Sequence, residues 1–220
     1  MIHPSGLNAK VVAKVVARRG RLHAFETLNP KTTALVVIDL NAASVAQSND
    51  CKAMAPRITA LAMALRQSGG TVAWVRTEFH LTPATIAQYG SDAHRFAAEL
   101  DPAGPGAQLW PELQVEDADL HAFKHGASAF FPGKCDLHSR LAARTIDHVL
   151  VAGTVTNVCC ESSARDAVEL GYRVTMVSDA CAGHAHGLHE AALNTFYRCF
   201  GDVRPSADVI RLIAEGLPSR

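Results

Sequence analysis

The sequence alternates between short runs of apolar residues and stretches with the pattern of an amphipathic helix. Residues 34–39 are apolar and largely β-branched up to Asp39, which is typical of a buried strand. Residues 56–67 then place apolar side chains on one helical face, and Gly69 and Gly70 end this helix before a second apolar run at 71–76. This order predicts a β-α-β unit with two parallel strands.

The same alternation continues along the chain. Further strands are predicted at 118–124, 148–152, 172–178 and near 202–203, and further helices at 136–144, 159–170, 187–198 and 205–214. Continuously apolar strands need helices on both faces of their sheet. We therefore expect an α/β fold, a three-layer sandwich with a mostly parallel, doubly wound central sheet flanked by helices. Residues 1–220 would form one domain, with 1–30 as an N-terminal helical extension.

Composition and charge exclude several partner classes. The chain has 21 Lys and Arg against 21 Asp and Glu, so it lacks the basic excess that nucleic acids or anionic membranes attract. No apolar run approaches the ~20 residues that span a bilayer. The first six residues lack the apolar core of a signal peptide, so we expect a cytoplasmic protein. Its six cysteines lack the density of a disulfide scaffold and are expected to be reduced thiols.

Ligands of such sheets bind beyond the carboxyl ends of the strands, so the residues that follow each strand are candidates for a site. Asp39, Arg76 and Lys124 occupy such positions, as does the turn 153–160. The segment 82–111 contains several Gly and Pro residues and is expected to be a long surface excursion that could carry part of a substrate pocket.

The turn after the fourth predicted strand carries a cysteine, Cys159, at the start of a predicted helix. Unpaired backbone N–H groups and the helix dipole favour a thiolate there and lower a thiol pKa. A thiolate is a nucleophile for acyl transfer, and the same N–H groups can hold an oxyanion. A cysteine in this position is also common as simple packing.

Three motifs together resemble the isochorismatase-like superfamily of cysteine hydrolases, from about Thr33 to Ile213. They are Val-Val-Ile-Asp at 36–39, Phe-Lys-His-Gly-Ala-Ser-Ala-Phe at 123–130, and Gly-x-x-Thr-Asn-x-Cys-x-Glu-Ser at 153–162. The resemblance is closer to N-carbamoylsarcosine and ureidoacrylate amidohydrolases than to metal-dependent nicotinamidases.

The resemblance implies a catalytic triad of Asp39, Lys124 and Cys159. Asp39 would accept the thiol proton, Lys124 would stabilise the charges, and Cys159 would attack a carbonyl to form a thioester. It also implies an oxyanion hole formed by the N–H groups of Val155 and Cys159, beside a cis peptide between Thr154 and Val155. Cys160, next to the nucleophile, is interpreted as a packing residue.

The chain departs from the family at two places. Relatives commonly continue Asp-x-Gln-x-x-Phe after the first strand, whereas here Asn41 and Ser44 occupy the Gln and Phe positions. No Asp-x-His of the nicotinamidase metal site follows the second strand, and neither His80 nor His94 has zinc-ligand spacing with a carboxylate. We therefore expect no metal and no cofactor.

These features predict a metal-independent amidohydrolase that cleaves a C–N bond of a small amide, carbamoyl or ureido compound. The candidate substrate contacts are Asn41, Arg76 as a carboxylate clamp, Phe130 and Thr156. Two alternatives stay open, an isochorismatase that cleaves a vinyl ether without a nucleophilic cysteine, and a non-catalytic member that binds a small molecule. The resemblance also implies a homo-oligomer, a dimer or a tetramer.

Overall fold

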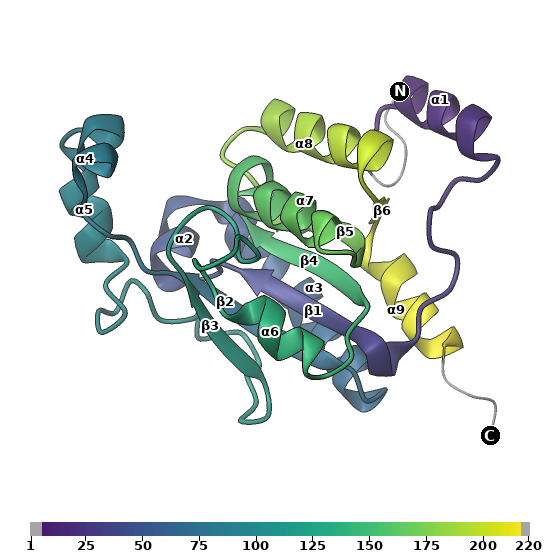
Figure 1. The fold of residues 1–220 in the computed structure, drawn as a ribbon, viewed down its shortest axis with the longest axis horizontal. Helices are drawn as coiled ribbons and strands as arrows, with labels where there is room; N and C mark the ends of the chain where they lie inside the picture. The colour runs from purple at the N-terminus through teal and green to yellow at the C-terminus, as the bar shows by residue number, and fades with distance from the viewer. Residues whose placement is uncertain (1–5, 217–220) are drawn as a thin grey trace.

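The computed structural model describes residues 6–216, and the remaining parts of the predicted 1–220 domain lie outside it. Its centre is a six-stranded sheet in the order β3-β2-β1-β4-β5-β6, in which every pair of neighbouring strands is parallel (Figure 1). The strands are β1 (Thr33–Ile38), β2 (Thr71–Thr77), β3 (Leu120–Lys124), β4 (His148–Thr154), β5 (Arg173–Ala182) and β6 (Asp202–Arg204). The chain runs outward from β1 in both directions, which confirms the predicted doubly wound α/β fold.

The two faces of the sheet are each packed against their own core. In β1 every residue is buried, and alternate side chains belong to different apolar clusters: Ala34, Val36 and Ile38 to one, Leu35 and Val37 to the other. This division follows from the two-residue period of a strand. The continuous apolar run is therefore explained by burial on both faces.

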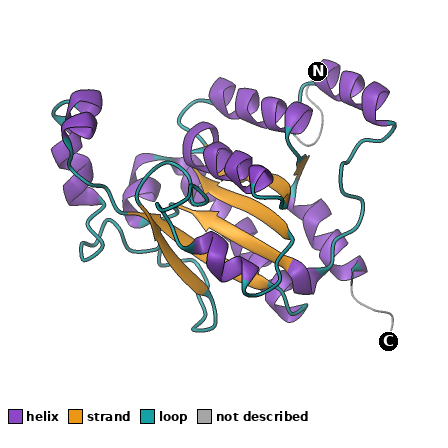
Figure 2. Cartoon of the chain, in the orientation of Figure 1, coloured by secondary structure: helices purple, strands orange, loops and turns teal. Residues whose placement is uncertain are grey.

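Helices cover both faces and complete three layers (Figure 2). Helices α1 (Ala9–Arg19), α6 (Leu137–Ala142), α7 (Glu161–Glu169) and α8 (His186–Cys199) contribute buried residues to the first cluster. Helices α2 (Ala42–Gln47), α3 (Asn49–Gln67) and α9 (Ser206–Glu215) contribute to the second. Among residues 6–216, no helix is both long enough and apolar enough to cross a membrane.

Helix α3 begins at Asn49, seven positions earlier than predicted, and Pro56 lies inside it. Proline ends a helix only when the loss of one N–H bond and a steric clash outweigh the packing gained beyond it. Here Cys51 and Met54 extend the apolar face of α3 before Pro56, and both are buried in the second cluster. That packing explains why the helix continues through the proline.

The segment 82–111 contains two helices, α4 (Pro83–Tyr89) and α5 (Asp92–Glu99), which the sequence analysis missed. Thr82 caps α4 through a reciprocal pair of hydrogen bonds with Thr85, and Pro83 occupies the first turn. Figure 1 shows both helices standing apart from the three layers. We call α4 and α5 the helical hairpin.

Helix α1 lies in the predicted N-terminal extension. Asn8 caps its start, Gly20 ends it in a left-handed conformation, and a 3₁₀ turn η1 (Pro30–Thr32) precedes β1. Val12 and Val15 of α1 are buried in the first cluster. The helix therefore packs on its own domain, and the homo-oligomer stays a prediction that the mass in solution tests.

Candidate active site

The three predicted catalytic residues meet at the carboxyl edge of the sheet. Asp39 follows β1 directly, Lys124 is the last residue of β3, and Cys159 lies in the turn η2 (Thr156–Cys160) after β4. Asp39 has a φ of 53°, an uncommon value outside glycine, and its N–H donates to the carbonyl of Val75 at 2.9 Å. This bond to the neighbouring strand holds the carboxylate at the edge.

Lys124 connects the other two side chains. Its Nζ lies 2.9 Å from Asp39 Oδ2 and 3.4 Å from Cys159 Sγ, and it also donates to the carbonyl of Gly126 at 3.0 Å. Lys124 is fully buried, and a buried ammonium is stable only when it is paired and hydrogen-bonded. The ion pair with Asp39 therefore supports the charge of this lysine.

Thr77, the last residue of β2, is a further member of the site. Its Oγ1 accepts a hydrogen bond from Lys124 Nζ at 2.5 Å and donates one to Asp39 Oδ1 at 2.9 Å. Strand β2 lies between β1 and β3 in the sheet, so its last residue falls between Asp39 and Lys124. Thr77 thus fixes the orientation of both charged groups.

The electrostatics of the triad differ from the expected lowered thiol pKa. Burial of the sulfur raises the pKa of Cys159 to about 12, and the Asp39 carboxylate acts in the same direction, against the smaller effect of Lys124. Burial opposes the charge of Lys124, but Asp39 and Cys159 outweigh it and raise the pKa of this lysine. Burial and the nearby Asp39 carboxylate both favour the thiol form of Cys159, which is opposite in direction to the lowered pKa expected at a helix start.

The turn that carries Cys159 agrees with prediction in one feature and differs in another. The peptide bond between Thr154 and Val155 is cis, as the resemblance implied. Cys159 lies in a π-helical turn, and α7 begins only at Glu161. Gly153 has a φ of 117°, and a Cβ there would lie 2.0 Å from the carbonyl oxygen of Ile38, so only glycine fits between β4 and β1.

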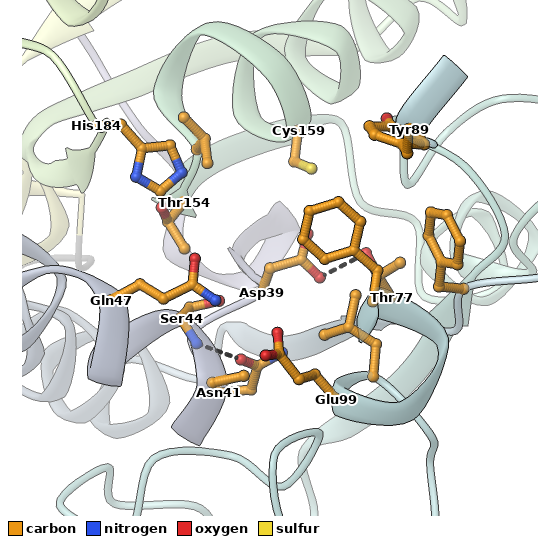
Figure 3. Close-up of a pocket in the computed structure, with 15 residues that line it drawn as sticks. Asp39, Asn41, Ser44, Gln47, Thr77, Tyr89, Glu99, Thr154, Cys159 and His184 are labelled. Atoms are coloured by element: carbon orange, nitrogen blue, oxygen red, sulfur yellow. Dashed lines mark hydrogen bonds between the residues drawn. The ribbon is translucent and has the colours of Figure 1, made fainter. Parts of the chain in front are cut away.

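A cavity of about 240 Å³ opens beside the triad (Figure 3). It is lined by Asp39, Asn41, Ala43, Ser44, Gln47, Thr77, Phe79, Tyr89, Phe96, Glu99, Leu100, Thr154, Val155, Cys159 and His184. Both residues of the predicted oxyanion hole, Val155 and Cys159, are among them. Tyr89, Phe96 and Glu99 come from the helical hairpin, so the segment 82–111 does form part of the cavity wall.

Of the four predicted substrate contacts, Asn41 lines the cavity. Its side-chain oxygen accepts from the N–H of Ser44 at 2.9 Å and caps α2, whereas its buried Nδ2 has no hydrogen-bond partner in the structure.

The other three predicted contacts lie elsewhere. Arg76 stacks on the ring of Phe123 at 4.4 Å, because successive residues of β2 point to opposite faces and Thr77 takes the cavity side. Phe130 is buried in the first cluster, with its ring 5.7 Å from that of Tyr172. Thr156 is buried and its Oγ1 lies 2.8 Å from His189 Nδ1.

One cluster of possible metal ligands was missed. Glu78, His80 and His125, which we call the histidine cluster, have ligand atoms within 4.8 Å of one another, with His80 Nε2 3.0 Å from Glu78 Oε1. The spacing of His80 in the sequence did not indicate a site, whereas the ends of β2 and β3 bring these three residues together in the fold. The histidine cluster contains one carboxylate and two imidazoles, side chains that can bind a metal, but none of the three residues lines the cavity.

Comparisons with known proteins agree with the fold and the motifs. Residues 33–208 match the isochorismatase domain. The chain is 29% identical over 189 residues to the uncharacterized isochorismatase family protein YwoC of Bacillus subtilis. This alignment covers 82% of this chain and 94% of YwoC. It is 30% identical over 213 residues to ureidoacrylate amidohydrolase RutB of Cronobacter sakazakii, covering 84% of this chain and 90% of RutB.

A solved structure supports the same assignment. A cysteine hydrolase from Pseudomonas syringae pv. phaseolicola superposes with a TM-score of 0.79 at 26% identity, over 89% of this chain and 99% of that one. The domain match covers most of the chain and includes Asp39, Lys124 and Cys159. The chain therefore belongs to the isochorismatase family and is a hydrolase of that family.

Proposed function

We propose that this protein is a cysteine amidohydrolase that cleaves the C–N bond of a small amide, carbamoyl or ureido compound without a metal. The observation that carries the proposal is the buried ammonium of Lys124, which contacts both the Asp39 carboxylate and the Cys159 sulfur. A nucleophile, a proton acceptor and a cation beside one cavity are the groups that acyl transfer needs. The likeness to ureidoacrylate amidohydrolase RutB supports this class of substrate.

The resting thiol defines the first step. With the thiol pKa raised to about 12, Cys159 becomes nucleophilic only as its proton moves to Asp39 during attack on the substrate carbonyl. The S–C bond forms, and the carbonyl π electrons move to oxygen. Lys124 stabilises the negative charge that develops on the sulfur while the proton moves to Asp39, and after the S–C bond has formed the charge is on the oxygen.

Collapse of the tetrahedral intermediate breaks the C–N bond. The proton held by Asp39 passes to the nitrogen, ammonia or an amine leaves, and a thioester remains on Cys159. Asp39 then takes a proton from a water molecule that attacks the thioester carbonyl. The C–S bond breaks, the acyl group leaves as a carboxylic acid, and Asp39 returns the proton to the sulfur of Cys159. The N–H groups of Val155 and Cys159, which both line the cavity, are the proposed donors to the oxyanion.

Ammonia release from a panel of small amides and ureido acids tests the proposal. We expect release with the wild-type protein and with Cys160→Ala, and none with Cys159→Ala. Cys160 is the matched control because it is adjacent in sequence but fully buried and absent from the cavity wall.

Two results would overturn the proposal. Hydrolysis of isochorismate by Cys159→Ala would favour vinyl ether cleavage. Tight binding of a small molecule without turnover would favour a non-catalytic role.

A further inference from the structure

The accessible charge of the cavity is negative. Among the described residues that line it there is no lysine or arginine, whereas Asp39 and Glu99 both contribute carboxylates. Lys124 lies behind this wall, with its side chain 1% exposed and its ammonium already bonded to Asp39, Thr77 and Gly126. The site therefore offers a substrate no free cation.

Neither arginine near the cavity changes this balance. Arg76, the predicted carboxylate clamp, lies over Phe123 and reaches the carbonyl of Ala107 at 3.5 Å. Arg95 of the helical hairpin is shared between Asp92 and Glu99, at 3.1 Å and 3.3 Å, and does not line the cavity. Two carboxylates pair with this single guanidinium, so the set of Asp92, Arg95 and Glu99 has a net negative charge.

The wall formed by the helical hairpin is apolar and aromatic. The rings of Phe79, Tyr89 and Phe96 meet edge to face, with centroids 5.5 to 5.8 Å apart, and all three line the cavity together with Leu100. Such a wall accommodates the apolar body of a substrate, and aromatic rings also tolerate a neighbouring cation.

Glu99 lies at the remote end of the cavity. In Figure 3 it is across from Cys159, with Asp39 between them and with Asn41 at its side. The side chain of Asn41 is a neutral amide that caps α2, so it supplies no charge to neutralise a carboxylate. A substrate attached at Cys159 would therefore direct its far end toward Glu99.

We propose that the cavity selects amides with an apolar body and an ammonium group at the end remote from the scissile carbonyl, and that Glu99 recognises this ammonium. This inference rests on the proposed function and deepens it. It separates the chain from RutB, whose ureidoacrylate substrate carries a carboxylate. A carboxylate in this cavity would meet like charge and lose its hydration without a cationic partner.

Three amides of equal length test the proposal: δ-aminovaleramide, which is cationic, hexanamide, which is neutral, and glutaramate, which is anionic. We expect kcat/KM to fall in that order. Glu99→Gln should lower the ratio of kcat/KM for δ-aminovaleramide to that for hexanamide about fivefold, as for the loss of a partly exposed ion pair. Glu99→Lys should make glutaramate better than δ-aminovaleramide.

Asp92→Asn is the matched control. Asp92 is a carboxylate on the same helix, bonded to the same arginine, but it lies outside the cavity, so the order of the three amides should not change. High salt should reduce the advantage of δ-aminovaleramide, because screening weakens a partly exposed pair.

Calorimetric titration of Cys159→Ala with the same amides gives a readout without turnover, and tightest binding of δ-aminovaleramide supports the proposal. A wild-type preference for glutaramate, an unchanged ratio of kcat/KM between δ-aminovaleramide and hexanamide in Glu99→Gln, or no difference in binding would overturn it. In each of these cases Cys159-dependent ammonia release would still uphold the proposed function, so the two failures are distinguishable.

Discussion

Asp39 should have opposite effects on catalysis and on the reactivity of the resting thiol. In the wild-type protein the negative carboxylate helps to keep Cys159 protonated, with a pKa of about 12. Asp39→Asn removes this charge and leaves the Lys124 ammonium beside the sulfur. The variant should therefore alkylate faster at Cys159 and yet lose amide hydrolysis, because it has no proton acceptor.

The size of the effect follows from the geometry. Asp39 Oδ2 and Cys159 Sγ lie 2.9 Å and 3.4 Å from the same Lys124 Nζ, so the two atoms are no more than about 6 Å apart. At an effective dielectric constant of about 20, the repulsion between two negative charges at that distance is about 3 kcal/mol. This energy corresponds to a roughly hundredfold rise in the thiolate population at pH 8.

The assay is alkylation by iodoacetamide at pH 8, followed by peptide mass spectrometry. Cys199, which is exposed, gives an internal reference rate within the same chain. Thr77→Val is the control, because it removes a hydrogen bond to Asp39 without changing the charge. Slower or equal alkylation of Cys159 in Asp39→Asn, relative to Cys199, would refute the reasoning.

Three further predictions concern stability and metal dependence. Asp119→Asn should lower the free energy of unfolding by about 3 kcal/mol in urea titrations, because its carboxylate, with the side chain 3% exposed, accepts hydrogen bonds from Arg66 and Trp74. The exposed Glu116 pairs with the same arginine, and Glu116→Gln should cost under about 1 kcal/mol. Burial lowers the pKa of His148 from 6.5 to about 4, so between these pH values only the unfolded state binds a proton at this residue. The free energy of unfolding should therefore drop by about 3 kcal/mol as the pH falls through this range. An equal dependence of stability on pH in His148→Gln would contradict this. Dialysis against a chelator should leave amide hydrolysis unchanged, because the histidine cluster does not line the cavity, and a loss restored by zinc would count against the proposed function.

The central strands were predictable because burial on both faces makes their sequence signal continuous. The six predicted strands correspond to β1 through β6, but β5 continues to Ala182, four residues beyond prediction. The helical hairpin was not predicted because α4 has no buried residue and thus no apolar stripe to read. Its signal was local instead, the cap at Thr82 followed by proline.

The site was predictable where it depends on strand ends and not where it depends on side-chain direction. Asp39 and Cys159 follow the adjacent strands β1 and β4, and Lys124 ends β3, which only β2 separates from β1, so the topology places all three along one edge of the sheet. Arg76 was misplaced because the sequence does not state which of two successive residues in β2 faces the cavity. The thiol pKa was predicted with the wrong sign because it depends on the burial of the sulfur and on the nearby Asp39 carboxylate, which only the folded arrangement reveals.

Trapping the acyl-enzyme tests the nucleophilic role of Cys159 most directly. An amide substrate is mixed with the protein, quenched in acid within the first turnovers, and the peptides are analysed by mass spectrometry. The account predicts the mass of the acyl group on Cys159, its absence from Cys160, and its release by hydroxylamine, as for a thioester. Turnover without any adduct in the wild-type protein together with full activity of Cys159→Ala, or an adduct on another residue, would contradict it.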